Sequence, residues 1–362
     1  MVVRPSCQTG RMDLLRLAGV PGVGKSTVAW AIAQQLAADG VRLGYVDIDQ
    51  LGMCYPGPDG DTDRWQLKET ALALIAARFA VAGAERLIVS GVADPAEALS
   101  GNGHPTVALW LDADEATRRE RLAPRGWTSA QLENALAVGS RETRDAYASW
   151  ARIPTDGHSV EETAATVLAR WGAGVAEAAP ARTVEAASGR VIWLTGPRCA
   201  GASMVGWEIA SARWEKGERT GFIDAAQLGF RWNIDHEVGA GNVAALHRLF
   251  SGAGARTTIV AAPFEIAPSD VRAAFPGADV LFVRLHADAS TTRDRVRRRV
   301  GGDGPRVIGD DLIGASREVV EGVVATAMRQ RQEPLREGEV LVETTGSTVA
   351  EVAALIVAHL AG

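Results

Sequence analysis

The chain is poor in cysteine and has no excess of positive charge. Its 362 residues include three cysteines, Cys7, Cys54 and Cys199, which are too few and too far apart in the sequence for a disulfide framework or a four-ligand zinc site. It has 38 Lys and Arg against 44 Asp and Glu, a formal net charge of −6. This balance argues against a dedicated nucleic-acid-binding protein, because such domains are usually basic.

Long apolar runs are also missing. No run approaches the roughly 20 residues that a membrane-spanning helix needs, and residues 1–13 lack the apolar core of a signal peptide. The chain is nevertheless 47% hydrophobic, which is enough to fill one or two cores and excludes general disorder. Since a domain usually has about 150 residues, we expect a cytoplasmic enzyme of two domains, without a membrane or nucleic-acid partner.

What the chain does contain is an internal repeat. When Leu17–Met53 is aligned with Leu194–Phe230 without a gap, 15 of 37 positions are identical, and Trp30 coincides with Trp207. The similarity continues with small shifts, for example from Gly83-Ala84 to Gly254-Ala255. The sequence therefore predicts a tandem duplication.

The boundary between the copies is an Ala- and Gly-rich stretch with a proline. We place the domains at residues 1–173 and 190–362, with a linker at 174–189. Within each copy, short continuous apolar runs alternate with helical patterns, as in a parallel sheet that is buried on both faces. This order predicts two doubly wound α/β domains, each with a mostly parallel sheet and helices on both sides.

A phosphate-binding loop follows the first predicted strand. Gly19-Val-Pro-Gly-Val-Gly-Lys-Ser26 satisfies the pattern G-x-x-x-x-G-K-[ST] and opens a predicted helix. Glycines let backbone amides turn inward, and the helix N-terminus favours anions. The predicted nucleotide contacts are Gly19, Gly22, Val23, Gly24, Lys25, Ser26 and Thr27. Lys25 is expected on the β- and γ-phosphates and Ser26 on Mg²⁺.

The second copy of the loop is degenerate. Gly196-Pro-Arg-Cys-Ala-Gly-Ala-Ser203 has Ala202 where the first copy has Lys25, and Ala226 stands in place of Asp49. Loss of the lysine removes the main γ-phosphate contact. We expect a catalytically defective second domain, packed on the first as an intramolecular pseudo-dimer. The sequence leaves open whether this half binds a nucleotide or contributes to the acceptor site.

The motif set resembles the P-loop small-molecule and nucleotide kinases, among them shikimate, gluconate and adenylate kinases and chloramphenicol phosphotransferase. The chain lacks the Asn-Lys-x-Asp motif of GTPases and the Leu-Ser-Gly-Gly motif of transporter ATPases. The resemblance covers residues 14–171 and, more faintly, 191–360. It implies ATP and Mg²⁺ as cofactors and a kinase whose N-terminal half transfers the γ-phosphate to a hydroxyl or phosphate of a small metabolite, a nucleoside or a nucleotide.

The resemblance also implies roles for acidic residues and for the acceptor loop. Asp49 is expected to orient or deprotonate the acceptor and Asp47 to serve Mg²⁺ or its water, although which carboxylate does which stays open. Alternation along the segment 44–49, at the end of the strand predicted for 43–48, places both on one side. Arg64 and Gly91 are expected in the acceptor pocket. The triple glycine of shikimate kinase is absent around Gly91, which argues against shikimate itself.

A lid and an adenine loop complete the expected site. By resemblance, Arg121 packs on the adenine and Arg125 reaches the transferring phosphate, tasks that suit a planar guanidinium. Arg141 is a further candidate for the acceptor, and Gly157 and Ser159 lie in the loop that cups the adenine. Ser159 also fits a helix capping box with Glu162. The alternative function is an ATP-binding regulatory or scaffold protein that uses the nucleotide as a switch.

Overall fold

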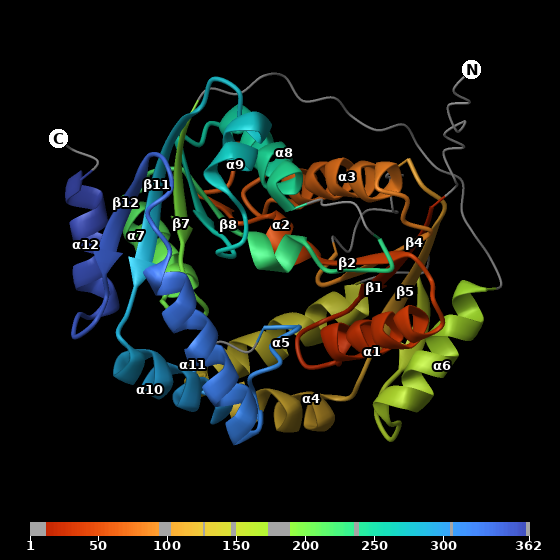
Figure 1. Cartoon of the computed structure of the whole chain (residues 1–362). Helices are drawn as coiled ribbons and strands as arrows, with labels where there is room; N and C mark the ends of the chain where they lie inside the picture. The colour runs from red at the N-terminus through yellow and green to blue at the C-terminus, as the bar shows by residue number, and fades with distance from the viewer. Residues whose placement is uncertain are drawn as a thin grey trace, which may run out of the picture. The chain divides into compact units, whose positions relative to one another are not determined.

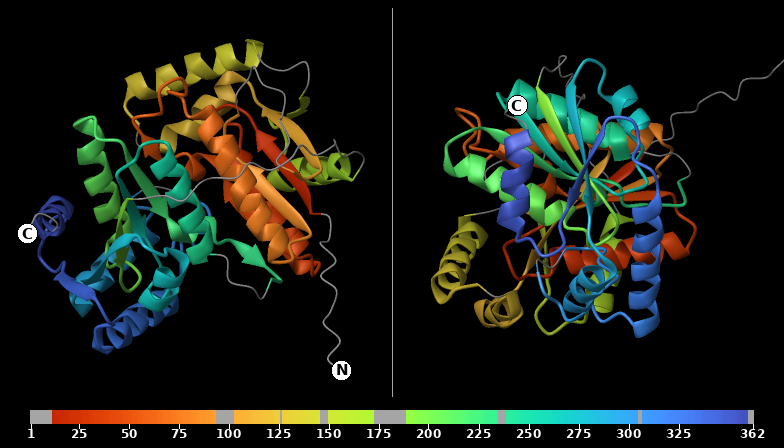
Figure 2. Two further views of the ribbon diagram at one scale, coloured as in Figure 1. Left: turned by 90° about the horizontal axis from the view of Figure 1, so that it is seen from above. Right: turned by 60° about the vertical axis from the view of Figure 1, so that its left-hand side comes forward.

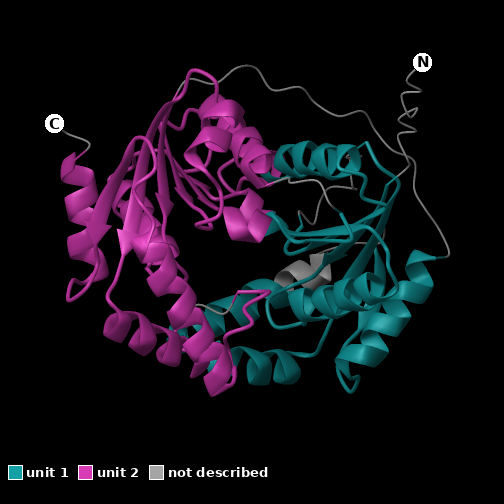
Figure 3. Ribbon diagram, in the orientation of Figure 1, with its two compact units in different colours: residues 1–49, 68–182, 229–238 teal, residues 50–67, 183–228, 239–362 magenta. Residues whose placement is uncertain are grey.

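The computed structural model of the chain describes residues 12–93, 103–125, 127–145, 150–172, 189–234, 239–304 and 307–359, and the side chains of 141–145 are excepted. The chain forms two compact units (Figure 3). Unit 1 comprises residues 1–49, 68–182 and 229–238, and unit 2 comprises residues 50–67, 183–228 and 239–362. The sequence-based division placed residues 50–67 in the first domain and 229–238 in the second, whereas the structure places each in the opposite unit. The predicted linker 174–189 lies outside the described residues, apart from Gly189.

Unit 1 is an α/β unit whose predicted order of strands and helices is confirmed. Its sheet has the order β6-β5-β1-β4-β2-β9, and all neighbours are parallel except β2 and β9. In Figure 1, α1 and α6 cover one face and α3 the other. The elements are β1 (Asp13–Ala18), α1 (Lys25–Ala38), β2 (Leu43–Asp47), α2 (Ile48–Leu51, which runs on into unit 2), α3 (Trp65–Val81, whose first turn belongs to unit 2), β4 (Arg86–Ser90), β5 (Thr106–Asp112), α4 (Glu115–Leu122), the 3-10 helix Ala123–Arg125, α5 (Ser129–Asp145), β6 (Ala151–Pro154), α6 (Val160–Trp171) and β9 (Arg231–Trp232).

Unit 2 repeats this plan. Its sheet has the order β12-β11-β7-β10-β8-β3, and only β3 is antiparallel to its neighbour. Helices α7 and α12 pack together on one face, and α8 and α9 lie on the other (Figures 1 and 2). The elements are β3 (Cys54–Tyr55), β7 (Arg190–Thr195), α7 (Ala202–Glu215), β8 (Thr220–Asp224), the 3-10 helix Ala225–Leu228, α8 (Gly239–Gly252), β10 (Thr257–Ala261), α9 (Pro268–Ala274), β11 (Asp279–His286), α10 (Ala289–Val300), α11 (Arg317–Gln332), β12 (Glu339–Glu343) and α12 (Val349–His359).

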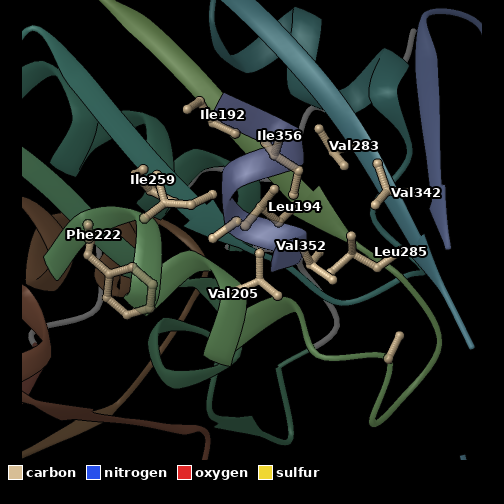
Figure 4. Close-up of a cluster of buried hydrophobic side chains, with 14 residues drawn as sticks. Ile192, Leu194, Val205, Phe222, Ile259, Val283, Leu285, Val342, Val352 and Ile356 are labelled. Atoms are coloured by element: carbon tan, nitrogen blue, oxygen red, sulfur yellow. The ribbon is translucent and has the colours of Figure 1, made fainter. Parts of the chain in front are cut away.

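The core of unit 2 is formed by branched aliphatic side chains between the sheet and the α7–α12 face. Ile192, Leu194 and Ile259 on the central strands are fully buried. They pack with Val205 of α7 and Ile356 of α12 (Figure 4). Side chains of this kind on adjacent parallel strands produce the continuous apolar runs seen in the sequence.

Each sheet is closed at one edge by a two-residue strand from the other copy of the repeat. In unit 1, β9 covers β2: Trp232 pairs with Leu43, and the Phe230 carbonyl accepts a 3.1 Å hydrogen bond from the Tyr45 amide. In unit 2, β3 covers β8, and the Met53 carbonyl accepts a 2.7 Å hydrogen bond from the Phe222 amide. An unpaired edge exposes backbone donors and acceptors, so this reciprocal exchange protects both sheets.

The tryptophan shared by the two copies packs on the exchanged strand in unit 1 and is linked to it through a second tryptophan in unit 2. In unit 1 the ring of Trp30 lies 5.0 Å from that of Phe230 and 5.2 Å from that of Trp232. In unit 2 Trp207 contacts Trp214, whose ring lies 4.8 Å from that of Tyr55 on β3. The tryptophan that is identical in the two copies therefore has a structural role in both.

Among the described helices, none is long and apolar enough to span a bilayer.

Candidate active site

The phosphate loop connects β1 to α1 in unit 1 and depends on glycine. Gly19, Gly22 and Gly24 all have positive φ angles. A Cβ at Gly19 would lie 2.4 Å from the Leu111 carbonyl oxygen, so no other residue fits there. Lys25 begins α1, and its ammonium group donates to the Val20 carbonyl at 3.0 Å, which holds this cation at the loop.

The N-terminus of α1 is open to an anion. Its cap, Gly24, supplies no side-chain hydrogen bond, and the first turn carries no acidic residue. Other helices of the same chain are capped by carboxylate or hydroxyl side chains, such as Asp114 on α4 and Ser159 on α6. The first amides of α1 thus keep their positive potential for a bound phosphate.

Asp47 and Asp49 lie together, but not for the predicted reason. The strand β2 ends at Asp47, and Asp49 is part of the short helix α2, so strand alternation does not bring them to one side. Instead the chain turns, and the Asp49 amide donates to Oδ1 of Asp47 at 2.9 Å. The prediction of two neighbouring carboxylates holds, whereas its strand-based argument was wrong.

The pKa of Asp47 is raised to about 7, first by burial and then by the negative charge of Asp49. The hydrogen bond from the Asp49 amide and the positive charges of Lys25 and Lys68 act against this rise. This carboxyl group therefore gains and loses its proton near neutral pH. A cation bound beside it would stabilise its negatively charged form. Two carboxylates with two lysines form a charged cluster beside the phosphate loop, an arrangement typical of active sites.

Lys68 was not among the predicted site residues. It lies on the second turn of α3, is nearly fully buried, and its ammonium group donates to Oδ1 of Asp49 at 2.9 Å. The Asp49 side chain keeps 45% of its surface exposed, against 7% for that of Lys68. The carboxylate is therefore oriented by a buried cation while one side of it stays accessible. Only a tertiary contact joins these residues, so no local pattern indicates the pair.

Gly91, at the end of β4, allows this cluster to form. Its φ angle is +129°, and a Cβ there would lie 2.7 Å from Cγ2 of Ile48 and 3.1 Å from Oδ1 of Asp47. The second copy has Ala262 at the equivalent position of the repeat. The backbone at Gly91 thus approaches the two acidic residues closely, and its place in the acceptor pocket stays a prediction.

Arg121 is fixed to the loop that precedes α6. Its guanidinium donates to Oγ1 and to the carbonyl of Thr155, both at 2.9 Å, while the Thr155 hydroxyl lies 3.1 Å from the Val23 carbonyl. A Cβ at Gly24 would lie 3.9 Å from Nη1 of Arg121, so the guanidinium lies at the end of the phosphate loop. The second copy repeats the contact, since Arg295 donates to Thr344 at 2.9 and 3.0 Å.

Arg118 is a second residue that the sequence reasoning did not single out. It is almost completely buried, and its guanidinium donates to the Pro21 carbonyl of the phosphate loop at 3.1 Å and to the Ala135 carbonyl of α5 at 3.2 Å. A side chain at Gly139 would clash with this guanidinium. Arg118 therefore links the phosphate loop to α5, the helix that follows the predicted lid arginines.

The remaining predicted residues are distributed as follows. Arg125 is exposed, with its guanidinium 5.6 Å from the centre of the Trp127 ring. Gly157 has a φ angle of +69° and open space around it, and Thr27 is exposed. Ser159 forms the predicted capping box with Glu162, which is confirmed. The side chain of Arg141 lies outside the described residues.

Arg64 belongs to unit 2 rather than to the unit that carries the phosphate loop. Its guanidinium lies 3.8 Å from the centre of the Tyr55 ring and donates to the Tyr55 hydroxyl at 3.0 Å. Its expected contact with an acceptor stays a prediction.

The degenerate loop in unit 2 is occupied by contacts within the chain. Arg198 forms an ion pair with Asp311, and Nη2 of Arg198 lies 3.7 Å from Asp310. Asp310 in turn pairs with Arg299. The Ser203 hydroxyl donates to Asp224 at 2.8 Å, so the counterparts of Ser26 and Asp47 persist and contact each other.

The residues of unit 1 fit a nucleotide phosphate with Mg²⁺. Among the described residues, no cluster of three His, Cys, Asp or Glu side chains is arranged for a metal ion. Mg²⁺ usually takes one or two protein ligands and completes its shell with phosphate oxygens and water. Ser26 next to the uncapped helix N-terminus, and Asp47 with its unfavourable negative charge, suit that mode of binding.

One family model and several solved structures are similar to part of this chain. Residues 16–145 match a family model described as an AAA domain. A gluconokinase from Sinorhizobium meliloti 1021 is 21% identical, with a TM-score of 0.29 over 45% of this chain and 92% of that chain. An APS kinase from Mycobacterium tuberculosis, solved with AMPPNP and APS, is 18% identical, with a TM-score of 0.31 over 49% of this chain and 100% of that chain.

A sugar kinase from Janibacter sp. HTCC2649 is 19% identical, with a TM-score of 0.31, and the match covers 45% of this chain and 95% of that chain. No curated protein matches the sequence. The family-model match and the geometry of the loop together show a P-loop domain in the first half of the chain.

Proposed function

We propose that unit 1 is an ATP- and Mg²⁺-dependent phosphotransferase, which moves the γ-phosphate to a hydroxyl or phosphate group of a small metabolite or nucleotide. One observation carries this proposal. Lys25, Asp49 and Lys68 lie together in unit 1, and all three are replaced in the second copy, by Ala202, Ala226 and Gly239. Gly239 is equivalent to Lys68 because each lies 15 residues before the glycine that the copies share, Gly254 and Gly83 respectively.

The groups that persist in the second copy have structural partners instead. Ser203 bonds Asp224, and Arg295 bonds Thr344, as Arg121 bonds Thr155. If Lys25 and Asp49 served only to shape the fold, there would be no reason for both to be missing from a second copy that keeps the same fold. We therefore assign the charged groups that are missing from the second copy to the substrate, and the groups that persist there to the scaffold.

The roles follow from exposure and charge. Asp49, which is accessible and held by Lys68, is placed to accept the proton of an acceptor hydroxyl as general base. Lys25 and the first amides of α1 stabilise charge on the transferred phosphate. Ser26 and Asp47 would hold Mg²⁺, which neutralises phosphate charge when bound. Arg121 holds the loop before α6, which would border the adenine. Arg125 is the candidate for reaching the phosphate from the lid.

Transfer of labelled γ-phosphate from ATP to a panel of hydroxyl metabolites and nucleotides tests the proposal. The wild-type chain should label at least one acceptor, and Lys25→Ala should reduce the rate by about 10²-fold or more, on the scale of one lost electrostatic stabiliser. Tight binding of ATP without labelling of any acceptor would instead support the nucleotide switch. A Lys25→Ala variant with an unchanged rate would refute the site.

A further inference from the structure

The segment Gln50–Leu67 connects the two residues of the Lys68–Asp49 ion pair, and it belongs to unit 2. It begins directly after Asp49 and ends directly before Lys68. The backbone therefore joins the two ends of the segment to the proposed general base and to the lysine that orients it. The position of the segment is set by what holds it within unit 2.

Arg219, at the start of β8, holds this segment with most of its guanidinium. Nε donates to the Pro56 carbonyl at 3.0 Å, and Nη2 donates to the Gly57 carbonyl at 3.0 Å. Nη2 also lies 3.4 Å from the Asp59 carboxylate. The remaining nitrogen, Nη1, donates to the Ala253 carbonyl at the end of α8 at 2.9 Å. One side chain thus joins the segment to the body of the second copy.

Two further contacts fix the same segment. Cys54 and Tyr55 pair with Gly221 and Thr220 as strand β3, and the ring of Tyr55 packs on Trp214. Met53 packs against the apolar core of unit 2. The segment is therefore a built part of unit 2 rather than a surface loop of the first copy.

The far end of the segment is equally ordered. A Cβ at Gly57 would lie 2.4 Å from the Thr62 carbonyl oxygen, so the loop closes tightly on itself. The Asp61 carboxylate accepts hydrogen bonds from the amides of Gln66 at 3.2 Å and Leu67 at 2.8 Å. This cap fixes the first turn of α3, and Lys68 follows on the same helix.

We propose that the segment Gln50–Leu67 borders the acceptor, and that Arg219 of the eroded copy is the residue that positions this segment. This inference rests on the proposed phosphotransferase activity. Arg219 acts through the backbone of residues 56–57, whose carbonyls accept its hydrogen bonds. Its loss should weaken use of the acceptor while leaving ATP binding as it is.

Arg42 provides a matched control, because it occupies the equivalent position of the first copy. A Cβ at Gly83 would lie 3.5 Å from Nη1 of Arg42, and one at Gly254 would lie 3.0 Å from Nη1 of Arg219. The Arg42 guanidinium, however, pairs with the Glu85 carboxylate at 2.9 Å and is half exposed. Arg42 thus has the same place in the repeat as Arg219, but its guanidinium pairs with a carboxylate, whereas that of Arg219 bonds the backbone of the exchanged segment.

The experiment compares full-length wild type, Arg219→Ala, Arg219→Lys and Arg42→Ala. Amide hydrogen exchange should become about tenfold faster in residues 52–62 of Arg219→Ala, since charge-assisted hydrogen bonds to that backbone are lost. With the acceptor found in the labelling panel, its KM should rise about tenfold or more, and the KM for ATP should stay within about twofold. Arg219→Lys should lie between, and Arg42→Ala should behave as wild type.

Unchanged exchange in residues 52–62 of Arg219→Ala would overturn the proposal, as would an unchanged KM for the acceptor. An equal rise in the KM for ATP would do the same, because it would mean general damage. If wild type labels no acceptor at all, the proposed activity fails and the positioning role fails with it. Faster exchange in Arg219→Ala would then still show that Arg219 anchors the segment, which distinguishes the two failures.

Discussion

The ammonium group of Lys68 lies 2.9 Å from a carboxylate oxygen of Asp49, although the 18 residues between them belong to the other compact unit. The chain leaves unit 1 directly after Asp49, the candidate general base, and returns to it at Lys68, the partner of that base. The ion pair is thus a contact within unit 1 that joins the residues on either side of the segment 50–67.

Replacing Lys68 with methionine should impair transfer more than nucleotide binding. Methionine keeps the volume of the buried stem but removes the cation that orients Asp49, and the loss of one such stabiliser costs about 10²-fold in kcat. The measurement is the rate of labelled phosphate transfer beside the affinity for a fluorescent ATP analogue. A Lys68→Met variant that transfers phosphate at the wild-type rate would show that the pair is only structural.

Stability should depend on pH through Asp47. Its folded pKa is raised to about 7 from an ordinary value of 3.8, so between these values the folded chain holds more protons at this site than the unfolded chain. This group therefore lowers the free energy of unfolding as the pH rises from 4 to 7, by at most about 1.4 kcal/mol per pH unit.

Asp47→Asn removes that contribution. Relative to wild type, the variant should gain stability at pH 8 and lose this gain at pH 4, as measured by urea unfolding without nucleotide. An equal difference in stability between the two proteins at both pH values would contradict the assignment of the raised pKa to Asp47.

Gly91→Ala tests the close packing around the two carboxylates. The added Cβ would meet Ile48 and Asp47 in a backbone conformation with φ of +129°. Gly157→Ala is its control, because φ is also positive there but nothing lies within 4 Å. The control should cost about 1 kcal/mol from the backbone alone, and Gly91→Ala roughly 1–3 kcal/mol more because of the clash. Equal losses of stability in thermal unfolding would argue against the packing described.

Asn233 tests the exchanged strand of unit 1. Its side-chain amide donates to the carbonyls of Ala37 at 3.0 Å and Val41 at 2.9 Å. Ala37 lies in the last turn of α1, and Val41 lies in the connection to β2. Asn233→Ala should lower the free energy of unfolding by about 1–2 kcal/mol. Asn233→Asp should lower it further, because a carboxylate cannot donate to two carbonyl oxygens. Urea unfolding that shows Asn233→Asp to be as stable as wild type would disprove the contact.

Much of the fold and part of the site were predictable because their signals are local. The apolar runs and the loop Gly19–Ser26 depend on neighbours in the sequence, and the structure has strands, helices and a phosphate loop at these places. The pairing of Cys54 and Tyr55 with β8 is different. Two residues carry no pattern of their own, and their partners lie more than 160 positions away.

One signal for the exchange was present in the sequence. The coincidence of Trp30 and Trp207 marks the two places where exchanged strands pack, but a single sequence does not say against what a tryptophan packs. Lys68 was missed because its link to Asp49 exists only after α3 has folded over the end of β2. Asp49 was predicted at the end of a strand, whereas it lies in α2, since the chain turns one residue earlier than the pattern indicated; its chemical role stays a prediction.

The stoichiometry of Mg²⁺–nucleotide binding tests the central claim, one working site and one eroded copy, most directly. Isothermal titration of the full chain with Mg²⁺ and a non-hydrolysable ATP analogue should give one molecule per chain. Ser203→Ala in the second copy should leave this number unchanged, whereas Lys25→Ala in the first should remove most of the binding. Two molecules per wild-type chain, or a single one that is lost with Ser203→Ala and kept with Lys25→Ala, would contradict the account.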